Sequence, residues 1–125
     1  MRGTVLLLGG QDSYAPYTDH LRANGLLVHQ VASPEGADTI VADVVLAVFS
    51  RNSSPTVIRE LRNRVDSATS IIAVSSREDR EAAHDAGADL VLLMPVPPDE
   101  ILYEIQRALI LRRSGRRLPR GGSQL

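Results

Sequence analysis

Apolar and polar residues follow one another along this chain in blocks, with short apolar runs separated by longer polar segments. The apolar runs are rich in Val, Leu and Ile and are bounded by Gly, Asn, Ser or Pro, a pattern typical of strands buried on both faces. The polar segments carry apolar residues at the three-to-four spacing of an amphipathic helix. The runs predict strands at residues 4–8, 26–31, 44–49, 70–74 and 90–93.

Helix-start and helix-stop signals occur in the segments between these strands. Ser33, Pro34 and Glu35 place a capping hydroxyl, a first-turn proline and a first-turn acid in succession. Gly25 and Gly87 follow apolar periodic segments, where a left-handed residue commonly ends a helix. The signals predict helices over about residues 15–24, 34–42, 55–65, 76–86 and 98–111.

Strands that alternate with helices predict a three-layer α/β fold with a parallel sheet, because parallel neighbours need crossover connections. Right-handed crossovers are strongly favoured, and we predict the flavodoxin-like strand order 2-1-3-4-5. In such sheets, ligands and chemistry lie at the carboxyl ends of the strands, near the point between strands 1 and 3 where the order reverses. The residues that directly follow each strand are therefore the candidates for a functional site.

Composition limits the chemistry that is open to the chain. Its 125 residues make one domain, and they include no cysteine, which excludes disulfides, cysteine-ligated metals and a thiol nucleophile. All 14 basic residues are arginine, so no lysine is present for catalysis. No apolar run approaches the roughly 20 residues of a membrane span. Residues 1–4 lead straight into a strand without a signal-peptide pattern, so we expect a cytoplasmic protein without membrane contact.

Charge divides the chain into two parts. Residues 1–105 carry 8 Arg and all 15 acids, whereas residues 106–125 carry 6 Arg and no acid. We predict a domain over residues 1–111 and an Arg/Gly-rich flexible tail or linker over residues 112–125. The tail is alternatively an electrostatic arm for an acidic protein surface or nucleic acid, or the join to an output domain. It has no aromatic residue for base stacking, which argues against sequence-specific single-strand recognition.

A resemblance to a known family becomes specific at residues 86–102, AGADLVLLMPVPPDEIL. This stretch resembles the AGADDYLxKPFxPEEL segment of response-regulator receiver domains, and the resemblance covers about residues 4–111. It implies a receiver-like fold and a role in two-component, phosphorelay signal transduction. Receiver domains bind magnesium through two acids after strand 1 and accept a phosphoryl group on an aspartate that ends strand 3. A hydroxyl after strand 4 and a lysine after strand 5 complete the family's site.

The resemblance places these functional positions on residues of different chemistry. The acid pair falls on Gly9 and Gly10, the acceptor on Val48, the hydroxyl on Ser75 and the lysine on Met94. Phosphoryl transfer needs metal and cation to neutralise the transferring group, and magnesium needs carboxylate oxygens. Four of the five positions lack that chemistry. We therefore expect a degenerate phosphorylation pocket, without cofactor or metal and without enzymatic activity.

Two alternatives remain open at this pocket. Asp12, two residues beyond the glycine pair, is the candidate for a metal ligand, although one carboxylate would make a weak magnesium site. The domain would then be a conventional phosphorelay regulator that uses a different acid, or else a flavodoxin-like domain that binds a small ligand at the strand ends. The Met94–Pro95 bond is predicted to be cis, because the corresponding bond in receivers is commonly cis.

The predicted function is regulation through protein contacts that do not depend on phosphorylation. Candidate interface residues lie off the predicted buried stripe of the last helix, and Val91 occupies the family's aromatic switch position. The resemblance implies a homodimer through the fourth helix, the fifth strand and the last helix. The alternative is that these residues only cover the edge of the sheet. The candidates on the last helix are Tyr103, Gln106, Arg107 and Ile110.

Overall fold

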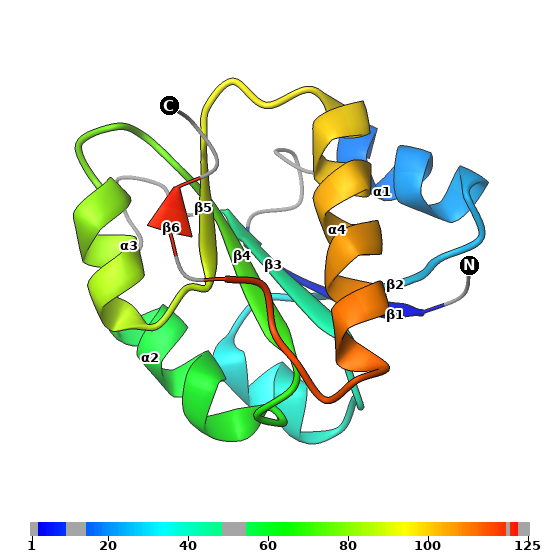
Figure 1. Cartoon of the computed structure of the whole chain (residues 1–125), viewed down its shortest axis with the longest axis horizontal. Coiled ribbons are helices and arrows are strands. Elements are labelled where there is room, and N and C mark those ends of the chain that lie inside the picture. The colour runs from blue at the N-terminus through cyan, green and yellow to red at the C-terminus, as the bar shows by residue number, and fades with distance from the viewer. Residues whose placement is uncertain (1–2, 10–14, 49–54, 120, 123–125) are drawn as a thin grey trace.

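The computed structural model describes residues 3–9, 15–48, 55–119 and 121–122 as an α/β fold (Figure 1). The strands are β1 Thr4–Leu8, β2 Leu27–Val31, β3 Val44–Val48, β4 Ser70–Ser75, β5 Leu90–Leu93 and β6 Gly121–Gly122. The helices are α1 Ala15–Ala23, the 3₁₀ helix η2 Pro34–Asp38, α2 Pro55–Arg64, α3 Arg80–Ala86 and α4 Pro98–Arg112.

The described strands form one parallel sheet in the order β2-β1-β3-β4-β5-β6. The predicted order of the first five strands is confirmed, and β6 adds to the outer edge of β5. Because β1 and β3 are neighbours, the sheet reverses its order between them. The carboxyl ends of β1, β3, β4 and β5 therefore meet along one edge.

Successive residues of the central strands face opposite sides of the sheet, and each side has its own apolar cluster. In β1, Val5 and Leu7 face one cluster, which α1 and α4 cover. Leu6 and Leu8 face the other, which η2, α2 and α3 cover. Both faces are thus buried, and this explains why the strands read as continuous apolar runs in the sequence.

The second helix is shorter and tighter than the sequence predicted. It is a 3₁₀ helix that ends at Asp38, and it packs closely on the end of β2. A Cβ built on Gly36 would lie 2.6 Å from the Cβ of Val31, so only glycine allows this approach. The helix was predicted to continue to about residue 42. In the structure, residues 39–43 are instead a connection from η2 to the start of β3.

The fourth helix also begins later than predicted. The capping pair is present, with the Ser76 hydroxyl donating to Asp79 Oδ2 at 3.0 Å and accepting from the Asp79 backbone N–H at 3.3 Å. The residues between them form a turn, and α3 itself starts at Arg80. The helix ends as predicted, with Gly87 at φ 122°, a backbone conformation that side chains disfavour.

In the segment after α4, which composition predicted as a flexible tail or linker, some of the described residues pack on the body of the domain. The chain turns back across the face of the sheet that α4 covers, as Figure 1 shows, and buries Leu118 at 3% exposure in the cluster on that face. Gly121 and Gly122 then pair with Leu90 and Val91 of β5. An apolar side chain within an Arg/Gly-rich stretch supplies the anchor that composition alone obscures.

Candidate functional site

The sheet brings the predicted pocket positions to one edge. Leu8 pairs in register with Ala47, and Val48 pairs with Val74, so the ends of β1, β3 and β4 lie level. Ser75 pairs with Leu93, directly before Met94. Gly9, Val48, Ser75 and Met94 thus line the carboxyl edge as the resemblance requires. Gly10 and Asp12 lie outside the described residues.

Gly9 has a backbone conformation that excludes most other residues. Its φ is 145°, and its N–H donates to the carbonyl of Val31 at 3.4 Å. An aspartate or glutamate at this position would be strained by its Cβ. The glycine is therefore set by the turn after β1, and a metal-binding carboxylate does not fit there. A hollow of about 200 Å³ lies beside it, lined by Gly9, Gln30, Val31 and Ala32.

Val48, which the resemblance places at the phosphoryl acceptor, is the last residue of β3. Its side chain is half-buried and packs against the cluster that α1 and α4 cover. A branched hydrocarbon has no nucleophilic atom, and at this place it extends the apolar core up to the edge of the sheet.

Ser75, the position of the family's switch hydroxyl, is fully buried. Its hydroxyl donates to the carbonyl of Ser76 at 2.9 Å, and its own carbonyl accepts from the Met94 N–H at 2.9 Å. These bonds fix the turn between β4 and α3 to the end of β5. Because the hydroxyl already has a local acceptor, its position is accounted for by the turn.

Met94, which the resemblance places at the family's lysine, directly follows β5. The side chain is 44% exposed and carries no charge, so it supplies no cation to this edge. The bond to Pro95 is cis, as predicted, and Pro95 is exposed. The following residue is held by Tyr17, whose hydroxyl donates to the carbonyl of Val96 at 2.8 Å. Burial raises the pKa of this tyrosine, which remains a neutral donor well into the alkaline range.

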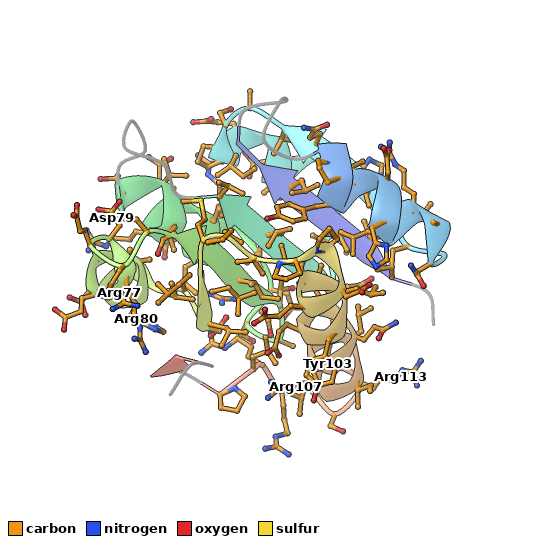
Figure 2. All side chains as sticks on the ribbon, turned by 90° about the horizontal axis from the view of Figure 1, so that it is seen from above. Arg77, Asp79, Arg80, Tyr103, Arg107 and Arg113 are labelled. Atoms are coloured by element: carbon orange, nitrogen blue, oxygen red, sulfur yellow. The ribbon has the colours of Figure 1, made fainter. Side chains whose placement is uncertain are left out.

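The predicted interface residues of α4 are on its outer side, where Figure 2 labels Tyr103 and Arg107. Tyr103 is 60% exposed and Ile110 is 53% exposed, and Gln106 is partly exposed between them. Arg107 Nη1 lies 2.6 Å from Oε1 of the buried Glu104. These residues form a continuous strip of mixed apolar and polar character on one helix face.

Val91 does not belong to this surface, and its prediction as an interface residue is corrected. The side chain is fully buried in the cluster that α2 and α3 cover. β5 is covered on both faces, with Leu90 and Leu92 in one cluster and Val91 in the other. A position within the family motif does not report how completely the strand is covered.

The amino-terminal ends of the strands, opposite the predicted pocket, carry a set of ion pairs that the sequence did not predict. Asp43 directly precedes β3 and lies 3.0 Å from Arg112 Nε, while Asp89 precedes β5. Asp89 Oδ2 accepts from Arg62 Nη1 at 3.0 Å and from the Ile71 N–H at 2.8 Å. The signal in the sequence was the charge division, since the acids of the body meet arginines of the terminal segment here.

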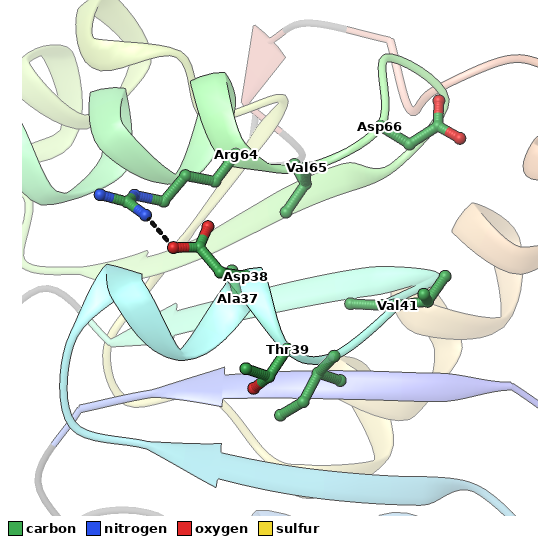
Figure 3. A pocket seen from close by; sticks show the side chains of 9 residues that line it. Ala37, Asp38, Thr39, Val41, Arg64, Val65 and Asp66 are labelled. Atoms are coloured by element: carbon green, nitrogen blue, oxygen red, sulfur yellow. Dashed lines mark hydrogen bonds and ion pairs between the residues drawn. The ribbon is translucent and has the colours of Figure 1, made fainter.

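A larger hollow of about 380 Å³ lies at this amino-terminal edge, between η2 and the end of α2 (Figure 3). The Arg64 side chain pairs with Asp38 across its mouth, and Val41 stands exposed beside it. Its position is remote from the carboxyl edge, so it is no part of the pocket that the resemblance implies. Among its lining residues, apolar and charged groups are mixed without a convergent set of donors.

No three histidines or acids among the described residues are grouped so that they could hold a metal ion. In the same part of the chain, no helix has the length and apolar character needed to cross a membrane.

Comparisons with known proteins give structural matches and no sequence matches. No family model matches the chain, and no curated protein matches it. A response-regulator receiver domain protein (CheY-like) from Methanospirillum hungatei is 16% identical, with a TM-score of 0.78, over 92% of this chain and 99% of that one.

Two further solved structures are similar over nearly their whole lengths. The beryllofluoride-activated DrrB receiver domain is 19% identical, with a TM-score of 0.73, over 88% of this chain and 99% of that chain. The chemotaxis response regulator CheY4 of Vibrio cholerae is 19% identical, with a TM-score of 0.72, over 87% of this chain and 100% of that chain. At such identities the likeness establishes a shared fold, whereas function depends on the residues at the site.

Proposed function

Since the chain has the fold of response-regulator receiver domains, we propose that it is a receiver-type signalling module that acts through protein contacts without aspartyl phosphorylation. The observation that carries the proposal is Val48 at the end of β3, where receivers place the phosphoryl acceptor. A valine cannot form an acyl phosphate. Without the acceptor, the phosphorylation switch of the family has no covalent step.

Two neighbouring positions support the same proposal. Gly9 offers no carboxylate, and its φ of 145° opposes the introduction of one. Met94 offers no cation to stabilise a transferring phosphoryl group. The acceptor, the metal ligand and the positive charge are therefore all missing from the positions where receivers have them. A different alignment would have to supply all three groups at once for phosphoryl transfer to be possible.

The contact surface in this proposal is the outer strip of α4, formed by Tyr103, Gln106, Arg107 and Ile110. Exposed tyrosine, arginine and isoleucine are side chains that protein interfaces use as anchors. The partner is a protein, and a second copy of the chain is the first partner to test. Contact through a rigid helix needs no chemistry at the carboxyl edge.

The decisive experiment tests for a phosphoryl adduct on the full chain. The protein is incubated with magnesium and a small phosphodonor, or with beryllofluoride, and its intact mass and melting temperature are measured. We expect no mass gain and no magnesium-dependent rise in melting temperature, because the acceptor and the cation are absent. A typical receiver domain, treated in parallel, provides the positive control.

A stable adduct would contradict the proposal and point to an acid in a different position. The variant Asp12→Asn distinguishes that case, because an adduct or metal site that depends on Asp12 disappears in it. A rise in melting temperature with a small ligand but without an adduct would instead favour a ligand-binding domain, with the hollow beside Gly9 as its first candidate site.

A further inference from the structure

The segment after α4 packs on the body of the domain through one buried side chain and an added strand. We call this segment the strap; its described residues are 116–119 and 121–122. Leu118 is its buried anchor, and the Leu118 N–H donates to the Ser70 hydroxyl at 2.9 Å. Gly121 and Gly122 extend the sheet by pairing with β5. The strap thus binds as an extended segment added to a sheet edge.

Charge complementarity accompanies this packing. The Arg117 Nε lies 3.5 Å from Asp89 Oδ1. The other oxygen of Asp89 is already held by Arg62 and by the Ile71 N–H, so the body orients this carboxylate without help from the strap. The acidic body, residues 1–105, therefore presents a fixed anion to the arginine-rich end of the same chain.

The contacts that hold the strap are few. Glycines form the whole of its described ladder and add no side-chain packing, and the Arg117 side chain remains 41% exposed. Leu118 is the one strap residue that is buried among those whose exposure is described. A single leucine side chain gives only weak binding. It is enough for a segment of the same chain, because the tether keeps the effective concentration of that segment in the millimolar range.

We propose that the strap is exchangeable, and that Ser70, Asp89 and the outer edge of β5 form a binding site for an extended basic peptide with one leucine anchor. In the closed chain the occupant is the strap itself. When the strap is released, the site takes the same segment from a second copy. Any partner that pairs with the edge of β5 must first displace the strap. This inference does not depend on the absence of phosphorylation.

The test uses full-length Leu118→Asp, in which the strap loses its anchor and the body is unchanged. The probe is a fluorescent synthetic peptide of residues 114–125, and binding is followed by anisotropy. We expect the variant to bind it at least about tenfold more tightly than the wild type, whose own strap competes at high effective concentration. A peptide with aspartate in place of the leucine is the matched control and should not bind.

A second pair of variants isolates the charge contact without altering the anchor. Arg117→Glu sets a negative charge beside Asp89, whereas Arg116→Glu makes the same change at an exposed residue for which the described structure contains no ion pair. We expect hydrogen exchange at the Leu118 amide to rise at least about tenfold in Arg117→Glu and to change little in Arg116→Glu.

Two results would overturn the proposal. One is a folded Leu118→Asp chain, judged by circular dichroism, that does not bind the peptide. The other is equal amide exchange in the two arginine variants. If Leu118→Asp fails to fold, the peptide is tested on Leu118→Ala, which shortens the anchor without placing a charge in the core, and an absence of binding there counts equally against the site. Neither assay involves a phosphodonor, so its failure is separate from failure of the proposed function.

Discussion

Arg62 connects three backbone and side-chain groups at the amino-terminal edge of the sheet. One guanidinium nitrogen donates to Asp89, and the other donates to the carbonyls of Asp66 and Thr69 at 2.8 Å each. Burial lowers the pKa of this guanidinium and the adjacent Asp89 carboxylate opposes that shift, so the side chain stays charged. The planar fork, more than the charge, holds the turn before β4.

Replacing Arg62 with lysine tests this geometry. Arg62→Lys keeps the charge but cannot make the three bonds at once, and we expect a loss of about 1–3 kcal/mol in the free energy of unfolding. The control is Arg64→Lys, two residues later. The pairing of Arg64 with Asp38 is more exposed, so we expect a much smaller change in the free energy of unfolding. Urea unfolding measures both. If Arg62→Lys lowers the free energy of unfolding as little as Arg64→Lys does, the positive charge alone accounts for the role of Arg62.

Among the elements, η2 shows how one close approach shapes a whole crossover. The segment carries good helix-start residues, yet it forms only a short 3₁₀ helix because Gly36 packs directly on Val31. Gly3, near the start of β1, makes a similarly close approach to Leu109, but there it meets the flexible end of the side chain. The two glycines thus differ in how readily their surroundings can move.

Alanine at each position separates these cases. Gly36→Ala should lower the free energy of unfolding by about 1–3 kcal/mol, because a branched side chain fixed to β2 cannot move away. Gly3→Ala should cost less than about 1 kcal/mol, since Leu109 can change rotamer and the unfolded chain also loses entropy. Thermal and urea unfolding provide the comparison. A cost for Gly3→Ala as large as that for Gly36→Ala would contradict this reading of the packing.

At the scale of the whole molecule, arginines from the basic end of the chain form ion pairs with acids from its acidic part. Arg112 pairs with Asp43 and Asp66, and Arg117 pairs with Asp89, so the basic end of the chain meets acids of its own body. An arm for nucleic acid is therefore not needed to explain these two arginines. Tyr103 and Ile110 on the outer strip of α4 remain exposed, and in the proposed function this strip is where a partner would bind.

Self-association through that strip gives a prediction about solution mass. The wild type should have about twice the chain mass of 13.6 kDa in light scattering at high concentration, and the double variant Tyr103→Ala, Ile110→Glu should have the mass of one chain. Both substitutions are at exposed positions, so folding should be retained. Val41→Glu, an exposed apolar site away from α4, is the control. A monomeric wild type would exclude this dimer and leave another protein as the partner.

The strands and helices were predictable where the spacing of apolar residues along the chain reflects which residues are buried. Both faces of β1, β3 and β4 are covered, which produces continuous apolar runs and made these strands predictable. Their order was predictable from the preference for right-handed crossovers in parallel sheets. Val91 was misplaced because a position in the family motif does not report that β5 is covered on both faces. Leu118 was missed because one apolar residue among arginines and glycines makes no periodic pattern.

The sequence by itself determined the alternating parallel architecture and the chemistry absent from Val48 and Met94, because burial periodicity and side-chain identity are local properties. Only the tertiary structure decided where the acids before the strands meet the terminal arginines, and that Leu118 closes the core beneath α4. Those contacts join residues far apart in the chain. Their existence depends on the path of the backbone, which no local pattern encodes.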